Sequence, residues 1–311
     1  MRNKVIFIIG PTAAGKTRLA LEIARVLPCE IVSVDSALIY RSMDIGTAKP
    51  DPQTLAAVPH HLVDLLDPAQ CYSVAEFCND ARTAIDRILQ RNRVPLLVGG
   101  TVMYFRALQQ GLSKLPPADP AIRRQLAQRA RQQGWAGLHR ELREVDPESA
   151  GKIHPNDPQR IQRALEVYLL TGRPLSRLKV EKPGSHFPYQ VLKFIVAYRQ
   201  RSRLNQPIEQ RFTQMLEAGF VAEVERLRAR GDLSLELPSM RCVGYRQIWE
   251  YLDGHYDYQE MCLRAVRATR QLAKRQYTWL NNETTAFRYA LEDGEPDVEI
   301  IKKIRQFVNC D

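Results

Sequence analysis

The stretch Gly10-Pro-Thr-Ala-Ala-Gly-Lys-Thr17 has the spacing G-x-x-x-x-G-K-T of a phosphate-binding loop. An apolar run at residues 5–9 precedes it, and a segment with helical periodicity at residues 19–27 follows it. Glycine at 10 and 15 permits a backbone that exposes consecutive N–H groups to an anion, and the helix beginning near Lys16 adds its positive end. This strand–loop–helix unit predicts an α/β fold that binds a phosphate group.

Three further apolar runs, at residues 30–34, 94–98 and 190–197, predict buried parallel strands. Asp35 follows the first run, and Gly99-Gly100-Thr101 follows the second. In doubly wound sheets the carboxyl ends of the strands line the ligand crevice, so Asp35 and Thr101 are expected to face the same crevice as the phosphate loop. Asp35 as a turn residue and Thr101 as a plain helix cap are the structural alternatives.

A change of composition after Gly111 predicts an insertion in this core. The stretch Leu115-Pro-Pro-Ala-Asp-Pro120 is typical of a linker, and residues 121–144 have a helical pattern rich in arginine. We therefore expect a mainly helical insertion at residues 116–183, and a core formed by residues 1–115 and 184–311 with C-terminal helices. Within the insertion, Asn156 or Asp157 is expected to cap a helix that starts at Pro158.

Composition restricts the class of protein. The 311 residues are 44% hydrophobic, enough for a large core, and contain no apolar run long enough for a membrane span or a signal peptide. Six cysteines without C-x-x-C spacing suit reduced thiols in the cytoplasm. The adjacent pair His60-His61 lacks a third ligand at suitable spacing, so we expect ordinary histidines rather than a metal site.

The net charge of +10 indicates a polyanionic partner, although charge alone does not separate tRNA from DNA or acidic protein. Residues 261–279 form a predicted helix whose five cations cover an arc of roughly 140°, with few carboxylates nearby. We interpret this basic stripe as a contact to a nucleic-acid backbone; its members are Arg264, Arg267, Arg270, Lys274 and Arg275. Residues 208–227 have the spacing of a helix with Arg211 exposed near its start, and residues after 281 are expected to be peripheral.

Two classes of function fit these residues. One is an enzyme that binds a phosphorylated small molecule and acts on a nucleic acid. The other is a nucleic-acid-binding NTPase motor, or a small-molecule kinase with incidental charge. ATP is the usual occupant of such a loop, but a nucleotide hydrolase would usually end the strand before Gly99 in an aspartate that organises magnesium. The Gly-Gly-Thr turn found there weighs against the second class.

Seven blocks, in order along residues 5 to about 280, closely resemble the tRNA dimethylallyltransferases. They are Gly10-Pro-Thr-Ala-Ala-Gly-Lys-Thr17, Val34-Asp-Ser-Ala-Leu-Ile-Tyr40, Met43-Asp-Ile-Gly-Thr-Ala-Lys-Pro50, Gly99-Gly-Thr101, His154-Pro-Asn-Asp-Pro-Gln-Arg160, Arg241-Cys-Val-Gly-Tyr-Arg-Gln247 and Thr269-Arg-Gln-Leu-Ala-Lys-Arg-Gln-Tyr-Thr-Trp279. The resemblance implies a P-loop NTPase-like core, with a parallel sheet flanked by helices, and a helical insertion that contacts tRNA. It also implies a monomer.

By this resemblance the protein is a prenyltransferase of tRNA processing. It would transfer a dimethylallyl group from dimethylallyl diphosphate to N6 of the adenosine directly 3′ of the anticodon, in tRNAs that read codons beginning with U. The implied cofactor is Mg²⁺, with Thr17 as its protein ligand, and the implied catalytic residues are Asp35, as general base, and Thr101. Diphosphate-binding residues would be Gly10, Pro11, Thr12, Ala13, Ala14, Gly15, Lys16, Thr17 and Arg211.

The resemblance further implies a set of tRNA-binding residues. These are Asp35, Ser36, Ala37, Leu38, Thr101, Arg123, Gln159, Arg160, Ile161, Gln162, Arg163, Met240, Arg241, Cys242, Val243, Gly244, Tyr245, Lys274, Arg275, Gln276, Tyr277, Thr278, Trp279 and Leu280.

Overall fold

The computed structural model describes residues 3–113, 115–180, 187–294 and 297–309. The chain forms two compact units, which we treat separately: unit 1 comprises residues 1–107 and 188–311, and unit 2 comprises residues 108–187. Unit 2 starts eight residues before the insertion expected at 116–183. The expected end of the insertion, at residue 183, lies outside the described residues.

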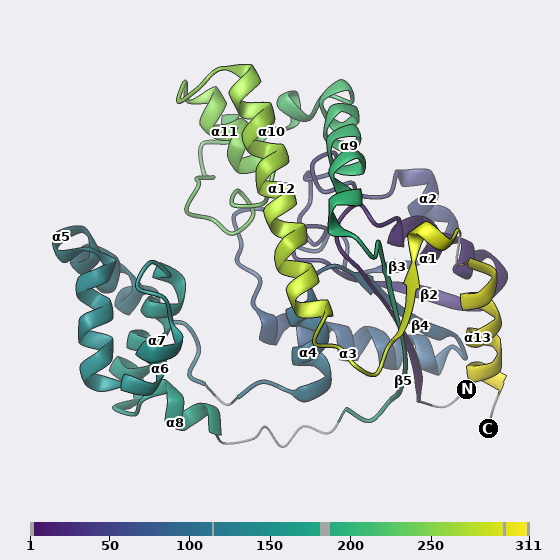
Figure 1. Cartoon of the computed structure of the whole chain (residues 1–311), viewed down its shortest axis with the longest axis horizontal. Coiled ribbons are helices and arrows are strands. Elements are labelled where there is room, and N and C mark those ends of the chain that lie inside the picture. Colours follow the sequence, from purple (N-terminus) through teal and green to yellow (C-terminus); the bar gives the residue numbers. More distant parts are fainter. Residues whose placement is uncertain (1–2, 114, 181–186, 295–296, 310–311) are drawn as a thin grey trace. The chain divides into compact units, whose positions relative to one another are not determined.

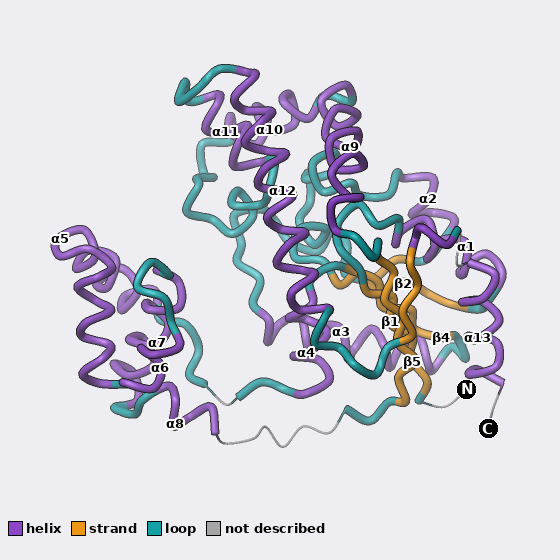
Figure 2. Tube along the Cα trace, viewed as in Figure 1, coloured by secondary structure: helices purple, strands orange, loops and turns teal. Residues whose placement is uncertain are grey.

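Unit 1 is built on a sheet of six parallel strands in the order β3-β2-β4-β1-β5-β6. The strands are orange in Figure 2. The strands are β1 (Lys4–Ile9), β2 (Cys29–Val34), β3 (His60–His61), β4 (Val94–Gly99), β5 (Gln190–Ala197) and β6 (Phe287–Ala290). The parallel sheet flanked by helices confirms the predicted α/β fold. Because β4 lies between β1 and β2, the loops that follow these three strands open at neighbouring points of one sheet edge.

Both faces of the sheet are covered, which explains why the central strands are continuous apolar runs. On one face, Ile6 and Ile8 pack with α1 (Lys16–Val26) and α13 (Asp297–Asn309). Phe7, which points to the other face, contacts Phe105 of α4 (Val102–Gln110) with ring centroids 4.9 Å apart. The remaining helix of that layer is α3 (Val74–Gln90), which begins with the expected capping box at Ser73 and Glu76.

The C-terminal residues belong to the core, so the expectation that they are peripheral is wrong. Strand β6 pairs with β5 in parallel, and Ile300 and Ile304 of α13 are fully buried against the sheet. Strand β6 has only four residues and includes Arg288, so its sequence does not show the apolar pattern by which a strand is recognised. An edge strand needs apolar residues only on the face that packs.

The remaining helices of unit 1 are α2 (Pro52–Ala57), α9 (Asn205–Glu217), α10 (Phe220–Ala229), α11 (Tyr245–Leu252) and α12 (Tyr258–Leu280), as Figure 1 shows. Short 3-10 turns occur at Arg201–Leu204 and Leu291–Asp293. The single helix expected over residues 208–227 is two helices, because Gly219 adopts φ of 93° between them. The capped break leaves the apolar periodicity of both pieces intact, so the pattern alone did not show it.

Unit 2 consists of α5 (Pro120–Val145), α6 (Pro147–Lys152), α7 (Pro158–Thr171) and α8 (Leu175–Val180) around a small apolar core. Asp157 caps α7 as one of the two expected candidates, and its side chain accepts a hydrogen bond from the Arg160 amide. Helix α5 is interrupted at Gly134, where φ is 72°, so the helix predicted over 121–144 is kinked.

No helix within the described part of the chain combines the length and the apolar character that a membrane crossing needs. The five cysteines at described positions are free thiols, as the spacing predicted; Cys310 lies outside the described residues.

Candidate active site

The phosphate loop connects β1 to α1 as predicted, and close packing explains its first glycine. A Cβ atom at Gly10 would lie 2.3 Å from the Val196 carbonyl oxygen of β5, so no larger residue fits there without a shift. Gly15 has φ of 69° and precedes the first residue of α1. Ala13 also has a positive φ, 62°, an unusual value for alanine that turns the loop toward the helix.

Lys16 lies at the start of α1 with its side chain folded back along the loop. Its ammonium donates a hydrogen bond to the Pro11 carbonyl oxygen at 2.6 Å. Burial lowers the pKa of Lys16 to about 8, the neighbouring charge of Asp35 opposes this shift, and Arg211 adds to it. The three side chains therefore act on one another electrostatically, although they come from three separate segments.

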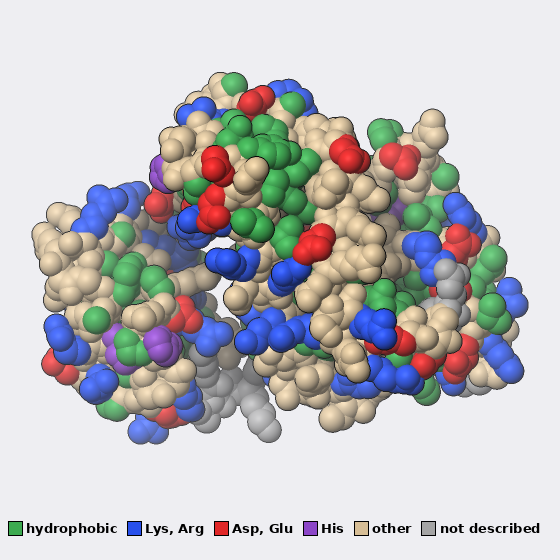
Figure 3. Space-filling view, turned by 45° about the horizontal axis from the view of Figure 1, so that its top comes forward, with side chains coloured by type: hydrophobic (Ala, Val, Ile, Leu, Met, Phe, Trp, Pro, Cys, Tyr) green, Lys and Arg blue, Asp and Glu red, His purple; other side chains and the backbone are tan. Residues whose placement is uncertain are grey.

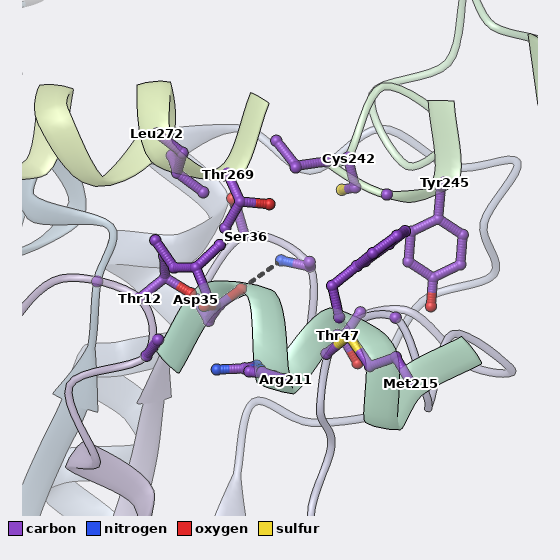
Figure 4. A pocket seen from close by; sticks show the side chains of 18 of the residues that line it. Thr12, Asp35, Ser36, Thr47, Arg211, Met215, Cys242, Tyr245, Thr269 and Leu272 are labelled. Carbon is purple, nitrogen blue, oxygen red and sulfur yellow. Dashed lines mark hydrogen bonds between the residues drawn. The ribbon is translucent and has the colours of Figure 1, made fainter. Parts of the chain in front are cut away.

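Asp35 directly follows β2, where the sequence placed it. One carboxylate oxygen, Oδ1, accepts a hydrogen bond from the Ala37 amide at 2.8 Å, which turns the chain at residues 35–37 (Figure 4). Among the described residues, the second oxygen, Oδ2, has no hydrogen-bond partner. The turn interpretation and the functional interpretation of Asp35 are thus compatible.

Thr101 follows β4 and sits beside the same turn. Its amide donates to the Val34 carbonyl oxygen at 3.3 Å, which ties the ends of β4 and β2 together. A Cβ atom at Gly99 would lie 2.0 Å from that same oxygen, so the first glycine of Gly-Gly-Thr is required by strand packing. These contacts bring Asp35 and Thr101 to one place, as the topology predicted.

A cavity of about 430 Å³ joins these segments within unit 1. Its polar lining includes Thr12, Asp35, Ser36, Thr101 and Arg211, and its apolar lining comes mainly from α9 and from residues 238–245. In Figure 4, Thr12, Asp35, Ser36 and Thr269 lie on one side of the view, and Met215, Thr47 and Tyr245 lie on the other. The other lining residues are Ala13, Ala37, Gly46, Gly100, Ile208, Phe212, Phe220, Pro238, Arg241, Cys242, Val243, Gly244, Leu272, Arg275 and Gln276.

Arg211 is half-buried in the wall of this cavity, so the expectation of an exposed residue is wrong. Burial lowers the pKa of Arg211, while the Asp35 carboxylate acts in the opposite direction. The periodicity of the predicted helix puts Arg211 on its polar face. In the structure this face borders the cavity, and the pattern of a single helix does not show what packs against it.

Some predicted diphosphate ligands lie away from the cavity wall. Among the eight loop residues only Thr12 and Ala13 line it, and Thr17 is exposed in the first turn of α1. No group of three or more His, Cys, Asp or Glu residues in the described ranges could hold a metal ion. The His60 ring bonds the Val58 carbonyl oxygen and the His61 ring bonds Glu30, as expected of ordinary histidines.

The segment 240–245 forms one wall of the cavity. Burial raises the pKa of the Cys242 thiol to about 12, so it is a neutral wall group. Tyr245, one of the implied tRNA-binding residues, is fully buried, and its hydroxyl donates to Glu223. The sequence reasoning missed Glu223, a charged residue on the apolar face of α10, whose carboxylate accepts from the amides of Asp44, Ile45 and Gly46.

The basic stripe of α12 is less isolated than the sequence suggested. Arg264 pairs with Glu260 at 2.7 Å and Arg270 pairs with Glu209 of α9, so carboxylates outside residues 261–279 neutralise two of the five cations. The Glu209 pairing crosses between helices and leaves no signal at helical spacing. Figure 3 likewise shows acidic side chains among the Lys and Arg side chains of the visible surface. Lys274 and Arg275 remain exposed.

Several predicted tRNA contacts have buried side chains. Each is at most 9% exposed; these residues are Ile161, Met240, Tyr245, Gln276 and Leu280. The Tyr277 hydroxyl donates to the Tyr198 carbonyl oxygen inside unit 1. Trp279 and Thr278 are exposed, and Arg106 lies over the Trp279 ring at 4.9 Å.

In unit 2, two of the three predicted tRNA-binding arginines pair with one buried carboxylate. Arg123 and Arg163 both pair with Glu166, which has no exposed surface, at 2.8 and 2.7 Å. The Gln162 side chain donates to the Arg123 carbonyl oxygen. Gln159 and Arg160 are exposed at the start of α7. Arg123 is 45% exposed, so its outer edge remains open while its inner edge holds Glu166.

The cavity is bordered by a phosphate loop, a carboxylate at a strand end and an arginine. This arrangement is typical of α/β proteins that act on a phosphorylated small molecule. The sequence profile described as IPP transferase matches residues 38–283 of the chain. The chain belongs to the IPP transferase family.

Solved structures of the family have the same fold. A full-length tRNA isopentenylpyrophosphate transferase from Bacillus halodurans is 34% identical, with a TM-score of 0.72 over 99% of this chain and 97% of that one. A tRNA delta(2)-isopentenylpyrophosphate transferase from Staphylococcus epidermidis is 29% identical, with a TM-score of 0.69 over 99% of both chains. A eukaryotic dimethylallyltransferase acting on tRNA is 25% identical, with a TM-score of 0.80 over 98% of this chain and 79% of that one.

Proposed function

We propose that the protein transfers a dimethylallyl group from dimethylallyl diphosphate to N6 of an adenosine in tRNA. The observation that carries the proposal is the meeting of Thr12, Asp35, Thr101 and Arg211 in one cavity of a chain that belongs to the IPP transferase family. The similar solved structures include prenyl transferases of tRNA, one of them solved acting on tRNA. The acceptor is the adenosine directly 3′ of the anticodon, in tRNAs that read codons beginning with U.

The two ends of the cavity suit the two parts of the prenyl donor. The diphosphate takes the polar end, where the phosphate loop, Lys16 and Arg211 supply positive charge. The five-carbon group takes the apolar end, against Phe212 and Met215. Burial of a small branched hydrocarbon against such side chains is favourable by about 25 cal/mol per Å².

Asp35 is the general base of the proposed reaction. The exocyclic amine of adenine is a weak nucleophile, because its lone pair is delocalised into the ring. As N6 bonds to C1 of the dimethylallyl group, the C1–O bond breaks and its electron pair leaves with the diphosphate. The proton lost from N6 passes to the carboxylate of Asp35, whose Oδ2 has no partner among the described residues.

Charge stabilisation on the leaving group completes the reaction. Negative charge grows on the bridging oxygen as the C1–O bond breaks, and donors already in place lower that barrier most. The donors available here are the amides of residue 13 and residues 15–17, the Lys16 ammonium, the Arg211 guanidinium and the Thr101 hydroxyl. They hold the diphosphate without needing a γ-phosphate, unlike the ATP site of a kinase.

Mg²⁺ is the proposed cofactor, and Thr17 is the residue that would hold it. The exposed Thr17 hydroxyl at the start of α1, with no acidic cluster in the described residues, fits an ion that takes its other ligands from diphosphate oxygens and water. When bound, the ion neutralises part of the diphosphate charge. The protein is proposed to act as a monomer.

The tRNA side of the proposal uses exposed cations. Lys274 and Arg275 of α12 and Arg160 of α7 contact the RNA backbone, and Ser36 and Ala37 border the reacting base. The adenine must leave its stack to reach Asp35, which takes a few kcal/mol that backbone contacts offset.

The direct test incubates the protein with unmodified tRNA, labelled dimethylallyl diphosphate and Mg²⁺, and measures label in the RNA. Mapping the labelled nucleotide then tests the position, and tRNAs that read codons beginning with other bases test the codon rule. ATP hydrolysis stimulated by RNA, with no label in the RNA, would contradict the proposal and favour the motor alternative.

A further inference from the structure

Gln276 of α12 joins the two anion-binding segments of the core. Its Oε1 atom accepts a hydrogen bond from the Thr12 amide of the phosphate loop at 2.9 Å. Its Nε2 atom donates to the Gly100 carbonyl oxygen of the turn after β4, also at 2.9 Å. The side chain is only 9% exposed, so both bonds are sheltered from water.

The chemistry of the two partners determines the orientation of the Gln276 amide. The Thr12 amide can only donate and the Gly100 carbonyl can only accept, so the oxygen must face Thr12 and the nitrogen must face Gly100. A glutamate at 276 would keep the first bond and turn the second into a repulsion between two oxygens. A glutamine is therefore the residue that satisfies both segments.

Gly100 is fitted to this side chain. A Cβ atom at Gly100 would lie 2.4 Å from Gln276 Nε2 and 3.3 Å from the Gly10 carbonyl oxygen. The second glycine of Gly-Gly-Thr is thus explained by the amide of a helix 176 residues later, not by a bound anion. The sequence blocks Gly99–Thr101 and Thr269–Trp279 therefore meet in one contact.

The same helix borders the substrate cavity. Thr269, Leu272 and Arg275 line it from α12, and Thr12 and Thr101 line it from the two segments that Gln276 connects. The Thr12 amide is occupied by Gln276 and the Ala14 amide by the Pro11 carbonyl oxygen, so an anion would bind the other amides of the loop. A change in the position of α12 would therefore move Thr12 and Thr101 together.

We propose that Gln276 is a positioning residue. It holds the phosphate loop and the Thr101 turn at one distance from α12, so that the diphosphate and the reacting base meet in the productive geometry. Both of its side-chain hydrogen bonds are to protein backbone, so its effect passes through Thr12 and Gly100. The proposal deepens the proposed prenyl transfer and rests on it.

The test compares full-length Gln276→Met and Gln276→Glu with Gln259→Met, a matched change at an exposed glutamine of the same helix. Calorimetry measures binding of inorganic diphosphate with Mg²⁺, filter binding measures tRNA affinity, and single-turnover assays measure transfer. We expect diphosphate affinity to fall about tenfold and transfer about 10²-fold in both Gln276 variants, because small misplacements of reacting groups have effects of that size. The tRNA affinity should stay within about twofold, and Gln259→Met should match the wild type.

A double-mutant cycle tests the contact itself. Gly100→Ala and Gln276→Ala disrupt the same bond. The double variant should therefore lose no more diphosphate affinity than the single variant with the larger loss. Additive losses would show that the two residues act independently and would overturn the proposal.

Three further outcomes are decisive. Folded Gln276 variants that bind diphosphate and transfer like the wild type would refute the role. Loss of the folded state in Gln276→Met, Gln276→Glu and Gly100→Ala, judged by thermal unfolding, would also refute it, because the contact would then serve stability alone. If the wild type binds diphosphate but transfers no prenyl group, the proposed function fails, while the diphosphate arm still tests Gln276.

Discussion

The Tyr245 hydroxyl donates a 2.5 Å hydrogen bond to the carboxylate of Glu223, which is only 2% exposed. The same carboxylate accepts from three consecutive backbone amides, at residues 44–46. It thereby holds the loop that carries Gly46 and Thr47 against the wall formed by α10 and α11. A single buried anion thus shapes the apolar end of the cavity without entering it.

Replacing this anion should destabilise the protein. In Glu223→Gln, the amide nitrogen faces backbone N–H groups and cannot accept from them, and hydrogen bonds to a charged group contribute about 1.5–3 kcal/mol each. We expect a loss of about 2–4 kcal/mol in the free energy of unfolding, measured by urea denaturation. Glu225→Gln, an exposed change on the same helix, is the control. Equal midpoints for the two variants would contradict the prediction.

Asp35→Asn should abolish proton acceptance while it preserves the shape of the site. We expect single-turnover transfer to fall by about 10²–10⁴-fold, the range typical of a removed general base. Binding of tRNA, measured by filter retention, should change little. Near-normal transfer with intact tRNA binding would rule out the role of Asp35 as the base.

Thr101→Ala should slow the chemical step more than it weakens tRNA binding. Thr101 lines the cavity beside Asp35, and removal of one hydrogen-bond donor to a developing oxyanion typically lowers the rate by about 10²–10³-fold. Single-turnover kinetics at saturating donor measure this effect. Thr278→Ala is the control, because Thr278 is exposed on α12 and does not line the cavity. It removes a hydroxyl of the predicted tRNA surface and should leave the chemical step unchanged.

The lowered pKa of Lys16, about 8, predicts a pH dependence of diphosphate binding. Below pH 8 the ammonium is charged and available to the anion; above it, the free protein must first take up a proton. Affinity for inorganic diphosphate should therefore fall with rising pH, by up to tenfold per pH unit, and calorimetry should detect proton uptake. Lys16→Met should bind more weakly at every pH and lack this component. An equal pH slope in the variant would assign the titration to another group.

Lys16 affects the folding stability in the opposite direction from diphosphate affinity as the pH rises. Its pKa in the folded protein lies below the ordinary value of 10.5, so between about pH 8 and 10.5 the unfolded chain binds more protons at this site. Stability at this residue therefore rises with pH in that window, while diphosphate affinity falls. Comparing thermal unfolding of wild type and Lys16→Met across the window separates the two effects.

Lys274 is the sharper test of the basic stripe, because Arg270 already pairs with Glu209. Lys274→Gln should weaken tRNA binding and lower the slope of log K against log salt by about 0.7–0.9, the value for one lost phosphate contact. Lys302→Gln, an exposed change on α13, should leave the slope unchanged. An unaltered slope in Lys274→Gln would remove this residue from the tRNA surface.

Much of the site was predictable because its residues follow directly on strands. The loop 10–17, Asp35 and Thr101 come after β1, β2 and β4, and parallel topology brings strand ends to one edge. The inward direction of Arg211 was not predictable, because the cavity that it lines, with the Asp35 carboxylate, is formed by segments far from it in the sequence. Glu223 was missed since a charged residue within an apolar helical pattern carries no sign of the amides it meets.

Local spacing along the chain encodes strands, helix caps and the phosphate loop, so the class of fold and the positions of the chemical groups follow from the amino-acid sequence. Which of these groups act together depends on how the elements pack. The tertiary structure buried Tyr245 and Gln276, paired Arg270 with Glu209, and brought residues 287–309 into the core. Such contacts depend on atoms far apart in sequence, and their hydrogen bonds and packing arise only when the elements meet.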